Sequence, residues 1–229
     1  MTAVDRRPDT PETPAPRTPA LSRRGHGVIV TVLNAKGGVG KTTATVYLAA
    51  ALAQAGLSVE VWDADAQGSA TEWLDDAAES LPEGTEPPFT HHPVNAATLR
   101  RRRPVAADVV LIDTPPLGAA IQEAAAARAD LVIVPTHHSA LDMARTWGTL
   151  EVLGKAVRAV VLLTMANPRT RTYTEALEAL DAEQQMRFAT PVPRREEYKR
   201  AVGTFPEIDQ TWQAVAADLT TAIERLTHR

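Results

Sequence analysis

The feature that most constrains this chain is a glycine-rich loop between an apolar strand and a helix. The run GVIVTVL (27–33) leads directly into NAKGGVGKTT (34–43), and a helical segment begins near Thr42. Closely spaced glycines let successive backbone N–H groups point inward around an oxyanion, and the helix N-terminus adds the positive end of its dipole. Glycine-rich turns without a ligand exist, but this strand–loop–helix order predicts a phosphate-binding loop in an α/β fold.

The side chains of the loop indicate how it would hold a nucleotide. Lys41 can reach the β- and γ-phosphates, and the Thr42 hydroxyl can ligate Mg²⁺. The standard pattern G-x-x-x-x-G-K-[ST] requires glycine at position 35, where this chain has Ala35. A second lysine, Lys36, precedes Lys41 in the same loop. Since one lysine is enough to hold the phosphates, we expect Lys36 to have a different role.

Apolar runs alternate with helical patterns along the rest of the chain. The further expected strands are SVEVW (58–62), ADVVLID (107–113), DLVIVPT (130–136), AVVLLTM (159–165) and RFATPVP (187–193). They are continuously apolar, as strands covered on both faces must be. Helical segments are expected at 42–54, 119–127, 140–153 and 174–185. This alternation predicts right-handed βαβ units and a mostly parallel, twisted sheet with helices on both faces.

Two regions depart from this alternation. The stretch 75–105 contains Pro82, Pro87 and Pro88 and is expected to be looser, ending in a helix capped by Asn95. The last helical pattern has its apolar residues three or four positions apart, on one face: Trp212, Val215, Leu219, Ile223 and Leu226. We expect this helix to close the core, because it lacks the basic polar face and opposing aromatic anchors of a membrane-surface helix.

Composition bounds the domain organisation and the function classes. Residues 1–25 hold five prolines and five arginines, which predicts a disordered tail, either simply solvated or contacting DNA or a partner. Residues 26–229 are expected to form a single domain. The chain has no cysteine, which excludes disulfides, iron–sulfur clusters and thiol nucleophiles. No apolar run has the roughly 20 residues of a membrane span, so a cytoplasmic location is expected. The net charge of −4 means that DNA binding would need local basic patches.

Carboxylates follow two of the expected strands. VVLIDTPP ends a strand in Asp113, where a carboxylate that holds Mg²⁺ through water is expected. VWDADAQGSAT ends another strand in Asp63 and Asp65. An Asp-x-Asp pair is often turn chemistry, but ligands of open α/β sheets bind at this carboxyl edge. Together with the loop, the pair indicates a catalytic site.

These motifs carry a resemblance to a known family. KGGVGKTT with its early lysine, then DADAQGSAT, then VVLIDTPP, resemble the deviant Walker ATPases of the ParA/MinD superfamily. DLVIVPTHHSALDMA, NPRTRTY and PVPRREEYKRA resemble ParA partition proteins more specifically, and the resemblance spans about residues 27–226. It implies a single-domain P-loop NTPase that binds ATP and Mg²⁺, hydrolyses ATP slowly under stimulation by a partner, and forms a nucleotide-sandwiched homodimer.

The resemblance also implies roles for single residues. Lys36 would reach across the dimer to the partner's ATP, and Asp65 would position the attacking water. The implied catalytic residues are Lys36, Lys41 and Asp65; the implied magnesium contacts are Thr42, Asp63 and Asp113; the implied nucleotide contacts are Lys36, Gly37, Gly38, Val39, Gly40, Lys41, Thr42, Thr43, Asp63 and Pro193. Two positions depart from the family pattern, because Ala66 replaces a frequent proline and Thr164 occupies the place of an adenine-binding asparagine, with Asn167 three residues on.

The resemblance further implies sequence-independent DNA binding by the ATP-loaded dimer. Candidate contacts are Arg169, Arg171, Arg194, Arg195, Lys199 and Arg200, with the block Arg100–Arg103 as another, and each could equally be a solvated face. The favoured function is partition of plasmid or chromosomal DNA with a ParB-like adaptor in a cytoplasmic, nucleoid-associated protein. The alternatives are positioning of a protein cargo over the nucleoid, or a MinD-like membrane-cycling regulator. No membrane partner is expected, and the absence of cysteine excludes the iron–sulfur relatives.

Overall fold

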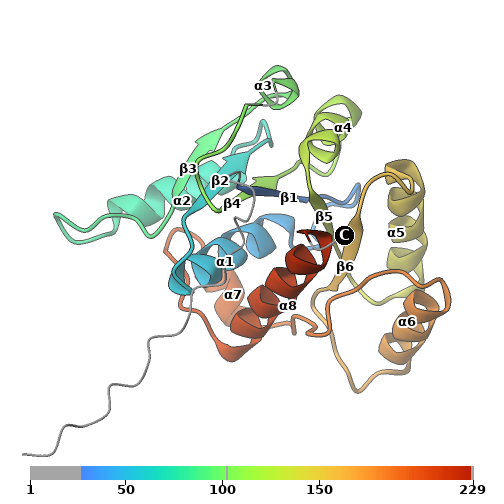
Figure 1. Ribbon diagram of the computed structural model, residues 1–229. Helices are drawn as coiled ribbons and strands as arrows, with labels where there is room; N and C mark the ends of the chain where they lie inside the picture. Colours follow the sequence, from blue (N-terminus) through green and yellow to red (C-terminus); the bar gives the residue numbers. More distant parts are fainter. Residues whose placement is uncertain (1–26, 102, 228–229) are drawn as a thin grey trace, which may run out of the picture.

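The computed structural model describes residues 27–101 and 103–227 (Figure 1). The predicted tail at 1–25 lies outside this range. The strands are β1 Val28–Val32, β2 Val59–Asp63, β3 Thr90–Pro93, β4 Val109–Asp113, β5 Leu131–Thr136 and β6 Ala159–Leu163. They form one sheet in the order β3-β2-β4-β1-β5-β6, in which all neighbouring strands pair in parallel. The predicted α/β fold class is confirmed.

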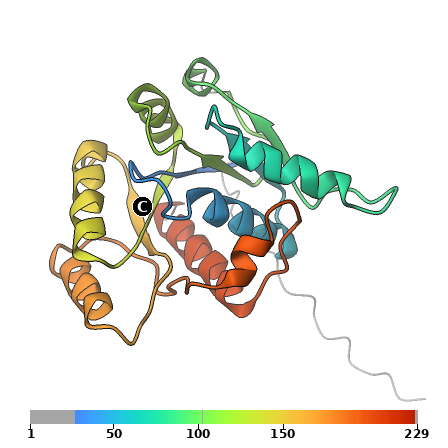
Figure 2. The same ribbon diagram turned by 180° about the vertical axis from the view of Figure 1, so that it is seen from behind.

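Helices cover both faces of this sheet (Figures 1 and 2). The described helices are α1 Lys41–Gln54, α2 Ser69–Glu79, α3 Ala96–Arg100, α4 Ala119–Arg128, α5 Ala140–Leu153, α6 Arg171–Ala182, α7 Glu196–Arg200 and α8 Gln210–Thr227. The first face packs against α1, α2, α7 and α8, and the second face packs against α3, α4, α5 and α6. The predicted cap of α3 is present, since the Asn95 side chain accepts the Thr98 N–H at 2.9 Å.

The last helix closes the main core, as its apolar stripe predicts. Trp212, Val215, Leu219 and Ile223 are all buried, and the ring of Trp212 stacks on Tyr47 of α1 with centroids 5.0 Å apart. The side chain of Leu226, the fifth residue of the predicted stripe, lies outside the described part. In the described chain, no helix is both long and apolar enough to cross a membrane.

The expected strand at 187–193 is wrong. The segment forms no strand; it meets β6 and the residues just after β6 through two isolated bridges, between Val161 and Arg187 and between Ala166 and Pro193. Between these bridges the Thr190 N–H donates to the Asp218 carboxylate of α8 at 2.8 Å. Pro191 follows and has no N–H to donate, so a continuous ladder cannot form. The edge strand next to β2 is instead β3, within the stretch 75–105 that was expected to be looser.

The parallel topology brings the carboxyl ends of three strands together. In the sheet register, Asp113 at the end of β4 lies between Val32 at the end of β1 and Asp63 at the end of β2. The glycine-rich loop follows β1, so it begins beside both carboxylates. Ligands of open parallel sheets bind at this edge.

Candidate nucleotide-binding site

The loop between β1 and α1 has the backbone of a phosphate cradle. Gly38 and Gly40 adopt φ angles of 74° and 83°, in the left-handed region that side-chain-bearing residues rarely adopt. Gly40 is the N-cap of α1, and no side chain caps that helix start. Its first N–H groups are therefore available to an anion at the positive end of the helix dipole.

Lys41 lies inside this cradle. Its side chain is buried, and its Nζ donates to the Lys36 carbonyl oxygen at 3.1 Å. Burial lowers the pKa of Lys41, and the nearby carboxylates of Asp113 and Asp65 partly counter this. A buried ammonium group that rests on a backbone carbonyl is well placed to exchange that contact for a phosphate oxygen.

Thr42 and Asp113, the two side chains predicted to contact magnesium, are hydrogen-bonded to each other. The Thr42 hydroxyl donates to one oxygen of Asp113 at 2.7 Å, and the Thr45 hydroxyl lies 3.3 Å from the other. Asp113 is fully buried, and burial raises its pKa to about 7. Hydroxyl and carboxylate oxygens are hard ligands, and Mg²⁺ is usually held by one or two of these together with phosphate oxygens and water. The donor set at this edge therefore fits magnesium.

Asp63 has a different local role. One of its oxygens accepts the Asp65 N–H at 2.9 Å, and the other accepts the N–H and the hydroxyl of Thr71, each at 2.8 Å. The side chain thus ties the loop after β2 to the first turn of α2. The magnesium and nucleotide contacts expected of Asp63 stay predictions, since both of its oxygens hold protein donors here.

Asp65 lies at the edge of the cradle. It is half-buried, and one of its oxygens accepts the Gln67 N–H at 2.9 Å. Its negative charge partly offsets the lowering of the Lys41 pKa by burial. This placement beside the phosphate loop is compatible with the expected positioning of a water, which stays a prediction.

The two loop lysines are held in different ways. Lys36 does not share the contact of Lys41; its ammonium group forms an ion pair with Asp142 in the first turn of α5. The second oxygen of Asp142 accepts the hydroxyl of Ser139, the N-cap of α5, at 2.6 Å. His137 Nδ1 lies 3.7 Å from that same oxygen. In the single chain, Lys36 therefore has an intramolecular anionic partner.

Sequence reasoning missed this partner. Asp142 and Ser139 form a Ser-x-x-Asp helix start, which the sequence shows. Nothing in the sequence indicates that Asp142 also pairs with Lys36, which is 106 positions away. His137 was missed as well. Its burial lowers its pKa, and its Nε2 is buried with no hydrogen-bond partner among the described residues.

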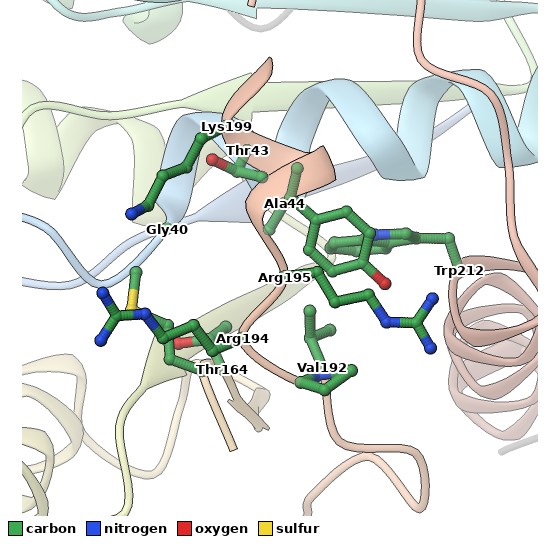
Figure 3. Close-up of a pocket in the computed structure, with 12 residues that line it drawn as sticks. Gly40, Thr43, Ala44, Thr164, Val192, Arg194, Arg195, Lys199 and Trp212 are labelled. Atoms are coloured by element: carbon green, nitrogen blue, oxygen red, sulfur yellow. The ribbon is translucent and has the colours of Figure 1, made fainter. Parts of the chain in front are cut away.

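A pocket lies beside the cradle, and we call it the base pocket after its predicted occupant (Figure 3). It is lined by Gly40, Thr43, Ala44, Thr164, Met165, Val192, Pro193, Arg194, Arg195, Tyr198, Lys199 and Trp212. The Thr164 hydroxyl donates within this wall, 2.9 Å from the Val39 carbonyl oxygen. Asn167 is not part of the lining; its side chain accepts the Arg169 N–H at 3.2 Å. The predicted nucleotide contacts Thr43 and Pro193 do lie in this pocket.

The six predicted DNA contacts differ in their location and in their ion pairs. Arg194, Arg195 and Lys199 line the base pocket, where Figure 3 shows them around the end of α7 and the loop before it. Arg195 is paired with Asp209 and Lys199 with Glu196. Arg171 is paired with Glu175, whereas Arg169 and Arg200 are exposed. The DNA roles of these six residues stay predictions.

Comparison with known proteins places this geometry in a family. The family model described as the CobQ/CobB/MinD/ParA nucleotide binding domain matches residues 30–205. A maintenance of carboxysome distribution protein A from Gloeobacter kilaueensis is 41% identical over 155 residues, covering 66% of this chain and 68% of that protein. The protein of the same description from Halothiobacillus neapolitanus is 30% identical, covering 75% and 82%. Protein ParA of Rhizobium radiobacter is 28% identical, covering 63% and 68%.

Solved structures show the same fold. McdA from Cyanothece superposes with a TM-score of 0.69 at 21% identity, covering 85% of this chain and all of that one. A plasmid partition protein from Borrelia burgdorferi bound to AMPPNP gives 0.70 at 17% identity, covering 87% and 99%. MinD from Pyrococcus horikoshii, complexed with Mg-ADP, gives 0.66 at 18% identity, covering 88% and 97%. With the glycine cradle, Lys41 and the Thr42–Asp113 pair in place, the match over residues 30–205 shows that this chain belongs to the CobQ/CobB/MinD/ParA family of P-loop ATPases.

Proposed function

We propose that this protein is an ATP-dependent positioning ATPase that dimerises around ATP, binds DNA without sequence preference and distributes a protein cargo along it. The identity to two carboxysome distribution proteins, 41% and 30%, supports cargo positioning ahead of the DNA partition that the sequence motifs first favoured. The cargo would be a large protein assembly linked through an adaptor.

One structural observation supports the proposed ATP-dependent dimer. Lys41 already occupies the cradle of its own chain, while the Lys36 ammonium group is turned toward α5 at the edge of the same loop. A second cation near the γ-phosphate stabilises charge that develops during transfer, much as an arginine finger supplied in trans does. If the partner's Lys36 supplies that cation, ATP occupancy and dimerisation become a single event and the monomer stays nearly inactive.

The remaining roles follow from the geometry of the site. Mg²⁺ bound beside Thr42 and Asp113 would neutralise phosphate charge, and the α1 N-terminus with Lys41 would orient the β- and γ-phosphates. Asp65, at the rim, would hold the attacking water. Slow hydrolysis stimulated by a partner would then set the lifetime of the DNA-bound dimer.

Light scattering and DNA binding test the proposal together. The Asp65→Ala protein should form a long-lived dimer with Mg·ATP and should bind duplex DNA only in that state, because water positioning matters mainly in the transition state. A protein that stays monomeric at saturating Mg·ATP would refute the sandwich dimer. Equal DNA affinity with and without ATP would refute the nucleotide-gated mechanism.

DNA partition is the second candidate, favoured by the 28% identity to Protein ParA over 152 residues. A ParB-like adaptor would then replace the cargo adaptor. Deletion of the gene separates the two functions. Mislocalised protein assemblies with normal replicon inheritance support cargo positioning, whereas loss of a plasmid or chromosome supports partition.

A further inference from the structure

A cluster of arginines lies outside the nucleotide site. We call Arg100, Arg101, Arg103 and Arg128 the arginine surface; they come from the end of α3, the loop after it and the end of α4. Arg101, Arg103 and Arg128 line a recess of about 240 Å³ together with Trp62, Thr98 and Pro104. The recess lies on the second face of the sheet, where α3 and α4 pack side by side (Figure 1).

Three of the four arginines, Arg100, Arg101 and Arg103, carry a positive charge that no neighbouring carboxylate neutralises in the described chain. All three are exposed. Two carboxylates on or next to strands β2 and β4 are held by other donors. Glu60 accepts the Trp62 indole N–H at 2.9 Å, and Asp108 accepts the N–H and the hydroxyl of Ser58.

Three of the six other basic candidates differ in this respect. Arg171, Arg195 and Lys199 each pair with a carboxylate, and the last two line the base pocket. A cation that is already paired gains less from a phosphate, because the existing ion pair must first be broken. Since the whole chain carries a net charge of −4, attraction to a polyanion must come from an unpaired local cluster.

The arginine surface lies away from the carboxyl edge of the sheet, where the phosphate loop is. Arg128 Nη2 donates to the Arg103 carbonyl oxygen, which ties the loop after α3 to the end of α4. Helix α4 begins after the carboxyl end of β4 and runs back across the sheet, so Arg128 lies toward the amino edge. A dimer that buries the phosphate loops at the carboxyl edge would leave both copies of the surface open.

We propose that the arginine surface is the contact for the phosphate backbone of duplex DNA, an inference that rests on the proposed function. Guanidinium groups bind phosphate oxygens through two parallel hydrogen bonds, and phosphate contacts carry no sequence information. The apolar ring of Trp62 offers a floor on which a deoxyribose can rest. Because a dimer presents two such surfaces and a monomer only one, two-site attachment makes DNA binding depend on ATP.

The test is the salt dependence of DNA affinity. We compare the full chain with its R101Q/R103Q variant, in Mg·ATP and on the Asp65→Ala background, using a fluorescent duplex of random sequence. Each lost phosphate contact reduces the slope of log affinity against log salt by about 0.9. Four arginines are lost per dimer, so the slope should fall by about 3 to 4 and the affinity at 0.1 M salt by at least about tenfold.

A matched control removes two charges from a competing cluster. The R169Q/R171Q variant should keep a slope within about one unit of the parent, and both variants should keep nucleotide-dependent dimerisation. Trp62 supplies a direct readout, because DNA should change the fluorescence of the parent protein and have a much smaller effect on the Trp62→Phe variant.

The outcomes separate the surface from the function. An unchanged slope for R101Q/R103Q, or a larger loss for R169Q/R171Q, overturns the arginine surface while DNA binding itself stands. Absence of DNA binding by the parent dimer overturns both proposals. If polyglutamate competes as well as duplex DNA at equal charge concentration, the surface is a site for acidic peptides and the DNA assignment is wrong.

Discussion

The ion pair between Lys36 and Asp142 gives a quantitative prediction about dimer formation. If Lys36 must reach the ATP of the partner, each subunit has to break this pair before the dimer can close. Asp142→Asn removes the charge and keeps the size of the side chain, so Lys36 should be released without a cavity. We expect the variant to dimerise at lower protein concentration than the parent.

The burial of the Lys36–Asp142 pair determines how much the dimer dissociation constant should change. The Asp142 side chain is 8% exposed and that of Lys36 is 24% exposed, so solvent only partly screens their contact. Hydrogen bonds to charged groups contribute about 1.5–3 kcal/mol, and the exposure of Lys36 favours the lower end. Two pairs break in each dimer, which gives about 3 kcal/mol, or about a hundredfold in the dimer dissociation constant.

The assay is light scattering over a protein concentration series in Mg·ATP, on the Asp65→Ala background to suppress turnover. Asp181→Asn is a suitable control, because it breaks the remote Arg187–Asp181 pair in the same way. A dimer dissociation constant that is unchanged or raised in Asp142→Asn, with the control unchanged, would refute the reasoning. Lys36 would then remain with its own chain, and the argument for a cation supplied in trans would fail.

Three further predictions test the site and the core. Lys36→Ala should bind ATP as a monomer with nearly normal affinity, and loss of that binding in equilibrium titrations would contradict this. Mixing Lys36→Ala with Asp65→Ala should restore partial hydrolysis, since one complete site forms in the heterodimer. Because the pKa of Asp113 is about 7 and its ionised form attracts Mg²⁺, Mg²⁺ affinity should weaken by up to about tenfold per pH unit as the pH falls below 7, and titrations of Asp113→Asn should lack this slope. Trp212→Ala should lower the free energy of unfolding by about 3–5 kcal/mol in urea titrations, because it empties the stack on Tyr47 in the main core; a loss below about 1 kcal/mol would show that the stack contributes little.

Local patterns in the sequence determined the fold class and the phosphate cradle. Five of the predicted runs became the strands β1, β2, β4, β5 and β6; apart from β2, which contains Glu60, they are largely apolar and are covered on both faces. The order strand, glycine loop, helix fixed the cradle and the positions of Lys41 and Thr42, since a phosphate loop is made by neighbouring residues. The carboxyl-edge rule then placed Asp113 beside it.

Contacts between residues far apart in the chain could not be predicted from the sequence. The run 187–193 has the composition of a strand, yet the Thr190 N–H donates to Asp218 and the segment pairs only through isolated bridges. Lys36 meets Asp142 only because β5 lies next to β1, which brings the start of α5 beside the loop. The basic clusters look alike as sequence, and only the fold pairs Arg195 with Asp209 while leaving Arg101 and Arg103 without a carboxylate among the described residues. A charge is neutralised by whatever side chain the packing brings within a few ångströms of it, and that neighbour can come from anywhere along the chain.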